Sequence, residues 1–199
     1  MRILHTSDWH LGQNFYSKSR AAEHEAFLNW LLETAQAHEV DAIIVAGDIF
    51  DTGSPPSYAR ELYNRFVVNL QQTGCHLVIV AGNHDSVATL NESRDILAFL
   101  NTTVVASAGH APQILKKRDG TPGAVLCPIP FLRPRDIVQS QAGLSGSEKQ
   151  QHLLQAITRY YHQQHTEACA LRGDQAIPII ATGPVSYTHL RAHETLSDL

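Results

Sequence analysis

The chain has 199 residues, of which 43% are hydrophobic and 17% charged, and a formal net charge of −4 at pH 7. These values suit one globular domain and exclude a protein that attracts nucleic acid through its overall charge. No apolar run is long enough for a secretion signal or a membrane span, and no Cys-x-x-Cys pair occurs among the three cysteines. We therefore expect a cytoplasmic protein with free thiols and no membrane contact.

The first half of the chain alternates predicted strands and helices. Residues 2–7, 41–46 and 77–81 are predicted strands, and the last two are mostly apolar runs that lack the alternation of a half-buried strand. Between them, residues 19–38 and the stretch from Pro56 to Gly74 repeat apolar side chains at helical spacing. This β-α-β-α-β order predicts an α/β fold with a parallel sheet.

The second half is less regular. Residues 90–100 and the stretch after a capping box at Ser147 and Gln150 are predicted helices, and 140–146 is a predicted loop. Residues 112–117 and 123–128 predict a β-hairpin, and 177–182 a further strand. Residues 128–135 contain three prolines and should be irregular, because proline lacks an N–H donor.

Side chains that bind metals follow each of the first three predicted strands. Asp8 and His10 follow the first, Asp48 the second, and Asn83 and His84 the third. The carboxyl ends of parallel strands meet at one edge of a sheet, so we expect these side chains to lie together. Their oxygen and nitrogen donors suit Mn, Fe or Zn, and Mg where oxygens dominate. A polar turn after each strand is the alternative, but three in succession favour a site.

The expected chemistry is hydrolysis at phosphorus. Asp48, from the middle strand, is placed to bridge two ions, which together clamp the attacking and leaving oxygens of an in-line displacement. His84 is placed to donate a proton to the leaving oxygen. Asp51 is placed to accept a hydrogen bond from this imidazole and orient it.

These motifs resemble the calcineurin-like metallophosphoesterase family. The segments at 6–12, 46–57 and 128–134 narrow the resemblance to its DNA nuclease subunits, and the similarity covers residues 1–183. It implies a two-sheet sandwich flanked by helices, with two divalent metal ions, Mn²⁺ foremost and Mg²⁺ as the alternative. It also implies a homodimer that acts with an SMC-like ATPase partner on DNA in repair and recombination, as a double-strand 3′-to-5′ exonuclease and single-strand endonuclease.

The resemblance assigns a role to each residue of the motifs. Asp8 and His10 bind the first metal, Asp48 bridges, Asn83 binds the second metal, and His84 is the catalytic histidine. The family adds a Gly-His after a later strand and a Gly-His-x-His beyond it, but here Pro184 follows Gly183 and no Gly-His-x-His occurs. We therefore expect a truncated nuclease domain at 1–183, an unrelated, disordered or foreign tail at 184–199, and weak or absent activity.

Two other functions remain open from sequence alone. A small-molecule metallophosphoesterase would share the same strand-end residues but would lack DNA binding with a steep salt dependence. A non-catalytic dimerisation or binding fragment would use one of the amphipathic helices. Arg133, Arg135 and the basic run at 116–118 are candidates for phosphate contacts, although solvated loop charges are the commoner role of such short clusters.

Overall fold

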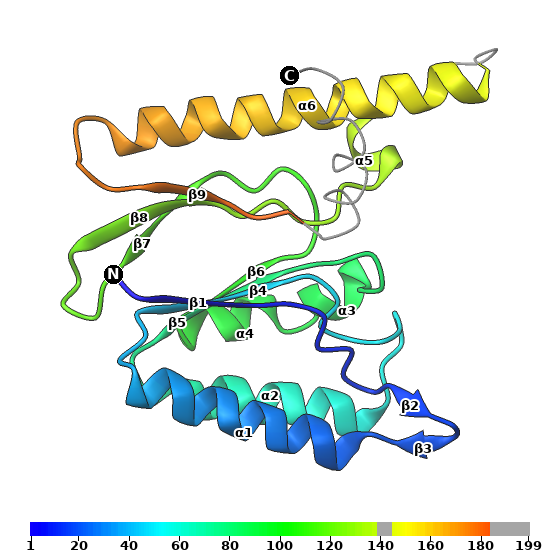
Figure 1. Cartoon of the computed structure of the whole chain (residues 1–199), viewed down its shortest axis with the longest axis vertical. Coiled ribbons are helices and arrows are strands. Elements are labelled where there is room, and N and C mark those ends of the chain that lie inside the picture. The colour runs from blue at the N-terminus through cyan, green and yellow to red at the C-terminus, as the bar shows by residue number, and fades with distance from the viewer. Residues whose placement is uncertain (139–144, 184–199) are drawn as a thin grey trace, which may run out of the picture.

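The computed structural model describes residues 1–138 and 145–183, and it has four layers (Figure 1). Two helices cover one face of a four-stranded sheet, a three-stranded sheet packs on its other face, and one long helix covers the outside of the second sheet. This is the two-sheet α/β architecture predicted from the sequence. The expected tail at 184–199 and most of the expected loop at 140–146 lie outside the described residues.

The first sheet is wholly parallel, as predicted. Its strands are β1 (Ile3–Thr6), β4 (Ala42–Ala46), β5 (His76–Val80) and β6 (Thr102–Val105), in the order β1-β4-β5-β6. All five residues of β4 and four of the five in β5 are buried, because the sheet is covered on both faces. The sequence reading missed β6, whose first two residues are threonines and break the apolar pattern.

Helices α1 (Ala21–Ala37) and α2 (Ser57–Gln71) cover the outer face of this sheet. The predicted apolar stripe of α2 is buried throughout: Ala59, Leu62, Tyr63, Phe66 and Leu70. Helix α1 begins two residues later than predicted, because a short hairpin precedes it. Its strands, β2 (Asn14–Phe15) and β3 (Lys18–Ser19), have two residues each, too few for any alternating pattern in the sequence.

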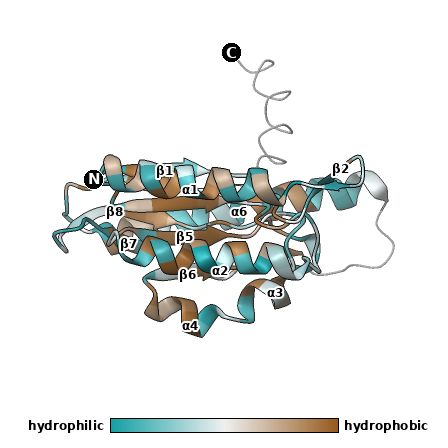
Figure 2. Ribbon diagram, turned by 90° about the horizontal axis from the view of Figure 1, so that it is seen from below, coloured by the Kyte–Doolittle hydropathy of each residue, from teal (hydrophilic) through white to brown (hydrophobic). Residues whose placement is uncertain are grey.

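The second sheet contains the predicted hairpin, β7 (Gln113–Lys116) and β8 (Pro122–Cys127), and β9 (Ile179–Ala181) lies parallel to β8. A thin apolar layer joins the two sheets. It consists of Ala42, Ile44, Val78 and Val80 from the first sheet and Leu115 and Leu126 from the second. Figure 2 shows the apolar character of the strands between the mixed surfaces of the helices.

Three helix predictions need correction. Helix α6 (Gly146–Arg172) has its capping box at Ser145 and Glu148, two residues before the predicted one, because the Ser145 hydroxyl accepts from the Glu148 amide. The predicted helix at 90–100 is two short helices, α3 (Val87–Asn91) and α4 (Arg94–Phe99). The stretch predicted as irregular contains α5 (Pro134–Ile137), with proline at its first position, where no N–H is needed.

The cysteines agree with the sequence interpretation. Cys75 and Cys127 are buried, Cys169 is partly exposed, and all three are free thiols. Within the described part of the chain, no helix combines the length and the apolarity needed to cross a bilayer.

Candidate metal centre

The loop after β1 carries Asp8 and His10, and both have left-handed backbone conformations, with φ of 54° and 45°. Such conformations are uncommon for residues other than glycine and concentrate at functional sites. Trp9, between them, is buried against Phe27 and Phe66 and donates its indole N–H to the Thr6 hydroxyl at 3.1 Å. The core therefore holds this loop from the inside and fixes the two predicted ligands that flank Trp9.

The loop after β4 has the same character. Asp48 also has a left-handed backbone, with φ of 49°, and its side chain is buried. Its Oδ1 accepts a hydrogen bond of 2.9 Å from the backbone N–H of His84, so the loops after β4 and β5 are joined through the predicted bridging ligand. Gly82 makes this approach feasible, because a Cβ there would clash with the Asp48 carboxylate and backbone nitrogen.

Asp85 also holds the loops after β4 and β5 together. Its carboxylate is 2% exposed and accepts hydrogen bonds from the backbone N–H groups of Ile49, Phe50 and Gly82, at 3.2, 3.0 and 2.8 Å. Burial raises the pKa of the Asp85 carboxyl group, while the three N–H donors act in the opposite direction. In the sequence, Asp85 directly follows Asn83 and His84 at the same strand end, but no specific role was predicted for it.

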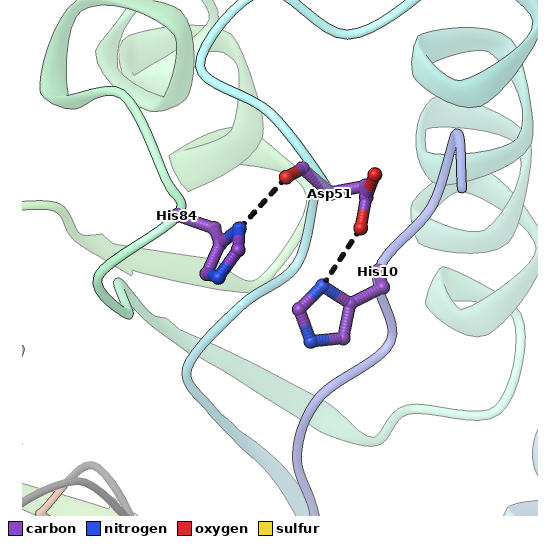
Figure 3. A group of neighbouring side chains, drawn as sticks. All are labelled: His10, Asp51 and His84. Carbon is purple, nitrogen blue, oxygen red and sulfur yellow. Dashed lines mark hydrogen bonds and ion pairs between the residues drawn. The ribbon is translucent and has the colours of Figure 1, made fainter. Parts of the chain in front are cut away.

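His84 is held by Asp51, but not by the atom that we expected. The Nδ1 atom of His84 lies 2.8 Å from the main-chain carbonyl oxygen of Asp51, rather than from its carboxylate (Figure 3). A carbonyl oxygen only accepts, so this Nδ1 carries a hydrogen. The same bond raises the pKa of His84, because it favours the protonated ring, and the negative charge of Asp48 adds to the effect.

The Asp51 carboxylate instead faces His10, with its Oδ1 3.2 Å from the Nδ1 of that ring. The rings of His10 and His84 stand edge to face, with centroids 5.0 Å apart. Figure 3 shows the three side chains converging from the loops after β1, β4 and β5. Asp51 therefore connects the two histidines, through its carboxylate on one side and its main-chain carbonyl on the other.

The side chains of Asp8, His10 and Asp48 fit a divalent cation. Each offers a ligand atom within 4.8 Å of the others. Two donors on opposite sides of a small divalent ion stand about 4.2 Å apart, so only a slight closure is needed. The Nδ1 of His10 is buried and lies close to the Asp51 carboxylate, but it makes no well-directed hydrogen bond. The ring of His10 is therefore available to bind a metal ion.

The predicted ligands thus divide into two sets. Asp8, His10 and Asp48 are brought together as expected. Asn83 is exposed on the loop that also carries His84, and its role as a ligand remains a prediction. Thr182, which follows β9, is buried, and its hydroxyl hydrogen is shared between the carbonyls of Cys127 and Ile129.

The segment between β8 and α5 supports the centre. The backbone N–H of Phe131 donates to the Ala81 carbonyl at 2.8 Å, and Arg133 donates to the Asp85 carbonyl at 2.7 Å. The other terminal nitrogen of Arg133, Nη1, is buried without a hydrogen-bond partner. Arg133 was a candidate for a phosphate contact from the sequence. In the structure, one of its hydrogen bonds holds the loop after β5.

Comparison with known proteins agrees with this geometry. Residues 1–164 match the family described as calcineurin-like phosphoesterase. The chain is 79% identical over all 199 residues to SbcD of the nuclease SbcCD from Escherichia coli K12, and covers 50% of that protein. It is 37% identical over 148 residues to the Rhodobacter capsulatus protein of the same name, covering 36% of it. The chain spans about half the length of the first of these relatives.

Proposed function

The chain belongs to the calcineurin-like phosphoesterase family, and from this premise we propose that it carries the catalytic centre of a DNA nuclease subunit of the SbcD type. The proposed reaction is metal-dependent hydrolysis of DNA phosphodiester bonds, as a double-strand 3′-to-5′ exonuclease and a single-strand endonuclease. The observation that carries the proposal is the convergence of Asp8, His10 and Asp48 in a chain so similar to a protein named as a nuclease.

The proposed cofactor is a pair of divalent cations, Mn²⁺ in the first place and Mg²⁺ as the alternative. Asp8, His10 and Asp48 would hold the first ion, and Asp48 and Asn83 the second. When bound, the ions would supply positive charge to stabilise the phosphate oxygens and would lower the pKa of a water molecule. The mixed oxygen and nitrogen donors of this set support that assignment.

His84 is the proposed general acid. Its Nδ1 is engaged by the Asp51 carbonyl, so the ring is held in one orientation and Nε2 is the nitrogen left for the substrate. The raised pKa of His84 supports a ring that carries a proton to give to the leaving oxygen. Asp51 acts through His84 and His10, and we assign it a positioning role.

The proposed assembly is a homodimer acting with the ATPase SbcC in the cytoplasm, in DNA repair, recombination and replication. The relatives' names support the partnership, since they are called subunits of SbcCD. The exposed apolar side chains of Val68 on α2 and Ile96 and Phe99 on α4, which are 51%, 67% and 88% exposed, support a second copy as a partner. Sedimentation of the protein with Phe99→Glu, against Trp30→Glu on α1 as the control, tests this dimer, because only Phe99→Glu should shift the protein to the monomer.

We further propose that residues 1–183 are the nuclease domain and that the 199-residue chain alone cleaves DNA weakly. That 184–199 are unrelated to the domain also stays a proposal, although the match to the E. coli relative runs through these residues. Asp48 and Asn83 are the two candidate ligands for the second ion among the described residues. Losing even an outer partner of a metal ligand costs about 10–100-fold in affinity or activity, so a two-ligand site should bind weakly.

The test is a Mn²⁺ titration followed by a DNA cleavage assay, using this chain and the full-length E. coli relative in parallel. The proposal predicts Mn²⁺-dependent cleavage by both, weaker for this chain, and its loss in Asp48→Asn. Robust cleavage of phosphomonoesters without any cleavage or binding of DNA would contradict it. That result would favour a small-molecule phosphoesterase, because the metal centre alone does not distinguish such an enzyme from a DNA nuclease.

A further inference from the structure

The hairpin β2–β3 lies at one end of the molecule (Figure 1), and two aromatic side chains of this hairpin are exposed to solvent. Phe15 is 66% exposed and Tyr16 is 88% exposed. Their rings pack edge to face, with centroids 4.6 Å apart. They thus form one small aromatic surface, which we call the aromatic tip, with the exposed Lys18 beside it on β3.

The turn between β2 and β3 has unusual residue types at its two central positions. Tyr16 and Ser17 are its two central residues, and both have positive φ, 47° and 64°. Two-residue turns of this kind strongly favour Asn, Asp and Gly, since bulky residues are strained at positive φ. A tyrosine here is therefore costly, and its ring gains little burial in return. Backbone strain that is not offset by burial of the side chain is expected where a residue takes part in binding.

The hairpin is rigidly connected to the metal centre. Gln13, at its base, donates its backbone N–H to the His10 carbonyl at 3.0 Å, and its side-chain nitrogen lies 3.4 Å from the Asp51 carboxylate. Arg20, which directly follows β3, donates a hydrogen bond to the Gln13 side-chain oxygen at 2.6 Å. Phe15 follows Gln13 by two residues, so at about 3.4 Å per residue its Cα lies no more than about 7 Å from that of Gln13.

We propose that the aromatic tip stacks on an unpaired nucleobase next to the phosphodiester that the metal centre holds. This inference rests on the proposed nuclease function. Exposed aromatic rings beside a basic side chain are the usual platform for single-stranded nucleic acid, since every base offers a π-face. The tip would hold the base while Lys18 faces the backbone, so that a frayed end or single strand is presented to the centre in preference to intact duplex.

The experiment uses the 199-residue chain and an oligonucleotide duplex whose single-stranded overhang carries the fluorescent base 2-aminopurine, with Ca²⁺ in place of Mn²⁺ so that the centre is filled while cleavage is suppressed. Stacking on Phe15 or Tyr16 quenches this base. Phe15→Leu and Tyr16→Leu keep an apolar side chain but lose the π-face, whereas Phe15→Tyr and Tyr16→Phe keep it. We expect about 5- to 50-fold weaker binding and lost quenching in the leucine variants, and wild-type behaviour in the aromatic ones.

Three controls separate the outcomes. Trp30→Leu removes an aromatic side chain of α1 that is 57% exposed and should change nothing. The Mn²⁺ affinity and thermal midpoint of each hairpin variant should match those of the wild type. Sedimentation of each variant without DNA shows whether the tip contacts protein instead.

Wild-type quenching that persists in both leucine variants would overturn the stacking inference and leave the nuclease proposal standing. Changed sedimentation without changed DNA binding would also overturn it and assign the tip to a protein contact. If the wild type itself binds no DNA while still binding Mn²⁺, the DNA substrate of the proposed function fails and the inference fails with it.

Discussion

The two sheets of this molecule contribute to the candidate site in different ways. The loops after β1, β4 and β5 of the parallel sheet carry every candidate ligand and the two histidines. The second sheet carries no ligand among the described residues, but the segment that leaves its strand β8 supplies support, because the Phe131 N–H donates to the Ala81 carbonyl and the Arg133 side chain donates to the Asp85 carbonyl. The chemistry is thus encoded locally, in short motifs at strand ends, while its rigidity depends on a region far away in the chain.

The largest expected effect concerns the ligand shared by both proposed ions. Asp48→Asn keeps the shape of the side chain but removes its charge, and we expect Mn²⁺ affinity to fall by more than about 100-fold, beyond the usual cost of an outer partner. Electron paramagnetic resonance of free Mn²⁺ measures this. Asp95→Asn removes the same charge from an exposed position on α4 and should leave affinity unchanged. If the two variants bound Mn²⁺ with the same affinity, the assignment of the metal site to the loops of the first sheet would be wrong.

The next effect tests the close approach between the loops after β4 and β5. In Gly82→Ala the new Cβ collides with Asp48, so the loops must separate. We expect about 1–3 kcal/mol less stability, the usual cost of overpacking, together with weakened Mn²⁺ binding. Urea denaturation measures the first. Gly146→Ala, at the start of α6, where a Cβ meets nothing within 4 Å, is the matched control and should not lose stability.

A smaller effect separates support from ligation. Arg133→Met keeps most of the side-chain volume but removes the hydrogen bond to the Asp85 carbonyl. We expect about 10-fold weaker Mn²⁺ binding, at the low end for outer partners, with the fold retained. Arg135→Met is the control, because that side chain is 76% exposed and forms an ion pair with its neighbour Asp136, at 3.6 Å. If the two variants bound Mn²⁺ with the same affinity, the segment between β8 and α5 would not support the centre.

The smallest effect lies at the other end of β5. Burial lowers the pKa of His76, whose Nε2 lies 2.9 Å from the Thr103 hydroxyl. The unfolded chain therefore binds the proton more readily, so the stability due to neutral His76 is complete above pH 6.5 and is lost as the pH falls below it. We expect His76→Gln to lose less stability than the wild type between about pH 7 and pH 5, by less than about 1 kcal/mol.

Chemical denaturation at both pH values measures this difference. The Mn²⁺ affinity at pH 7 should be the same in His76→Gln and the wild type, because His76 opens the strand whose other end carries the site. An unchanged pH dependence of stability in the variant would contradict the assignment to His76.

The part of this picture that could be predicted follows the same division. The strands β4 and β5, the stripe of α2 and the gathering of Asp8, His10 and Asp48 follow from short-range patterns. The hairpin β2–β3 and strand β6 were missed, because two-residue strands and a threonine pair carry no period.

Long-range contacts were equally invisible. Nothing in the sequence indicates that Asp51 holds His84 through its carbonyl, because any residue offers a carbonyl and only the folded loop decides which one is in reach. The role of Asp85 depends on contacts with residues 35 and 36 positions away in the chain, and that of Arg133 on a contact 48 positions away. Such residues are found only once the fold is known.

The most direct test of the account is to locate manganese by anomalous scattering in crystals of this chain grown or soaked with Mn²⁺. The account predicts a strong peak bound by Asp8, His10 and Asp48, and a weaker second peak between Asp48 and Asn83. Manganese found only elsewhere, for example at His165 and Cys169 on α6, whose Nε2 and Sγ lie 3.6 Å apart, would contradict it.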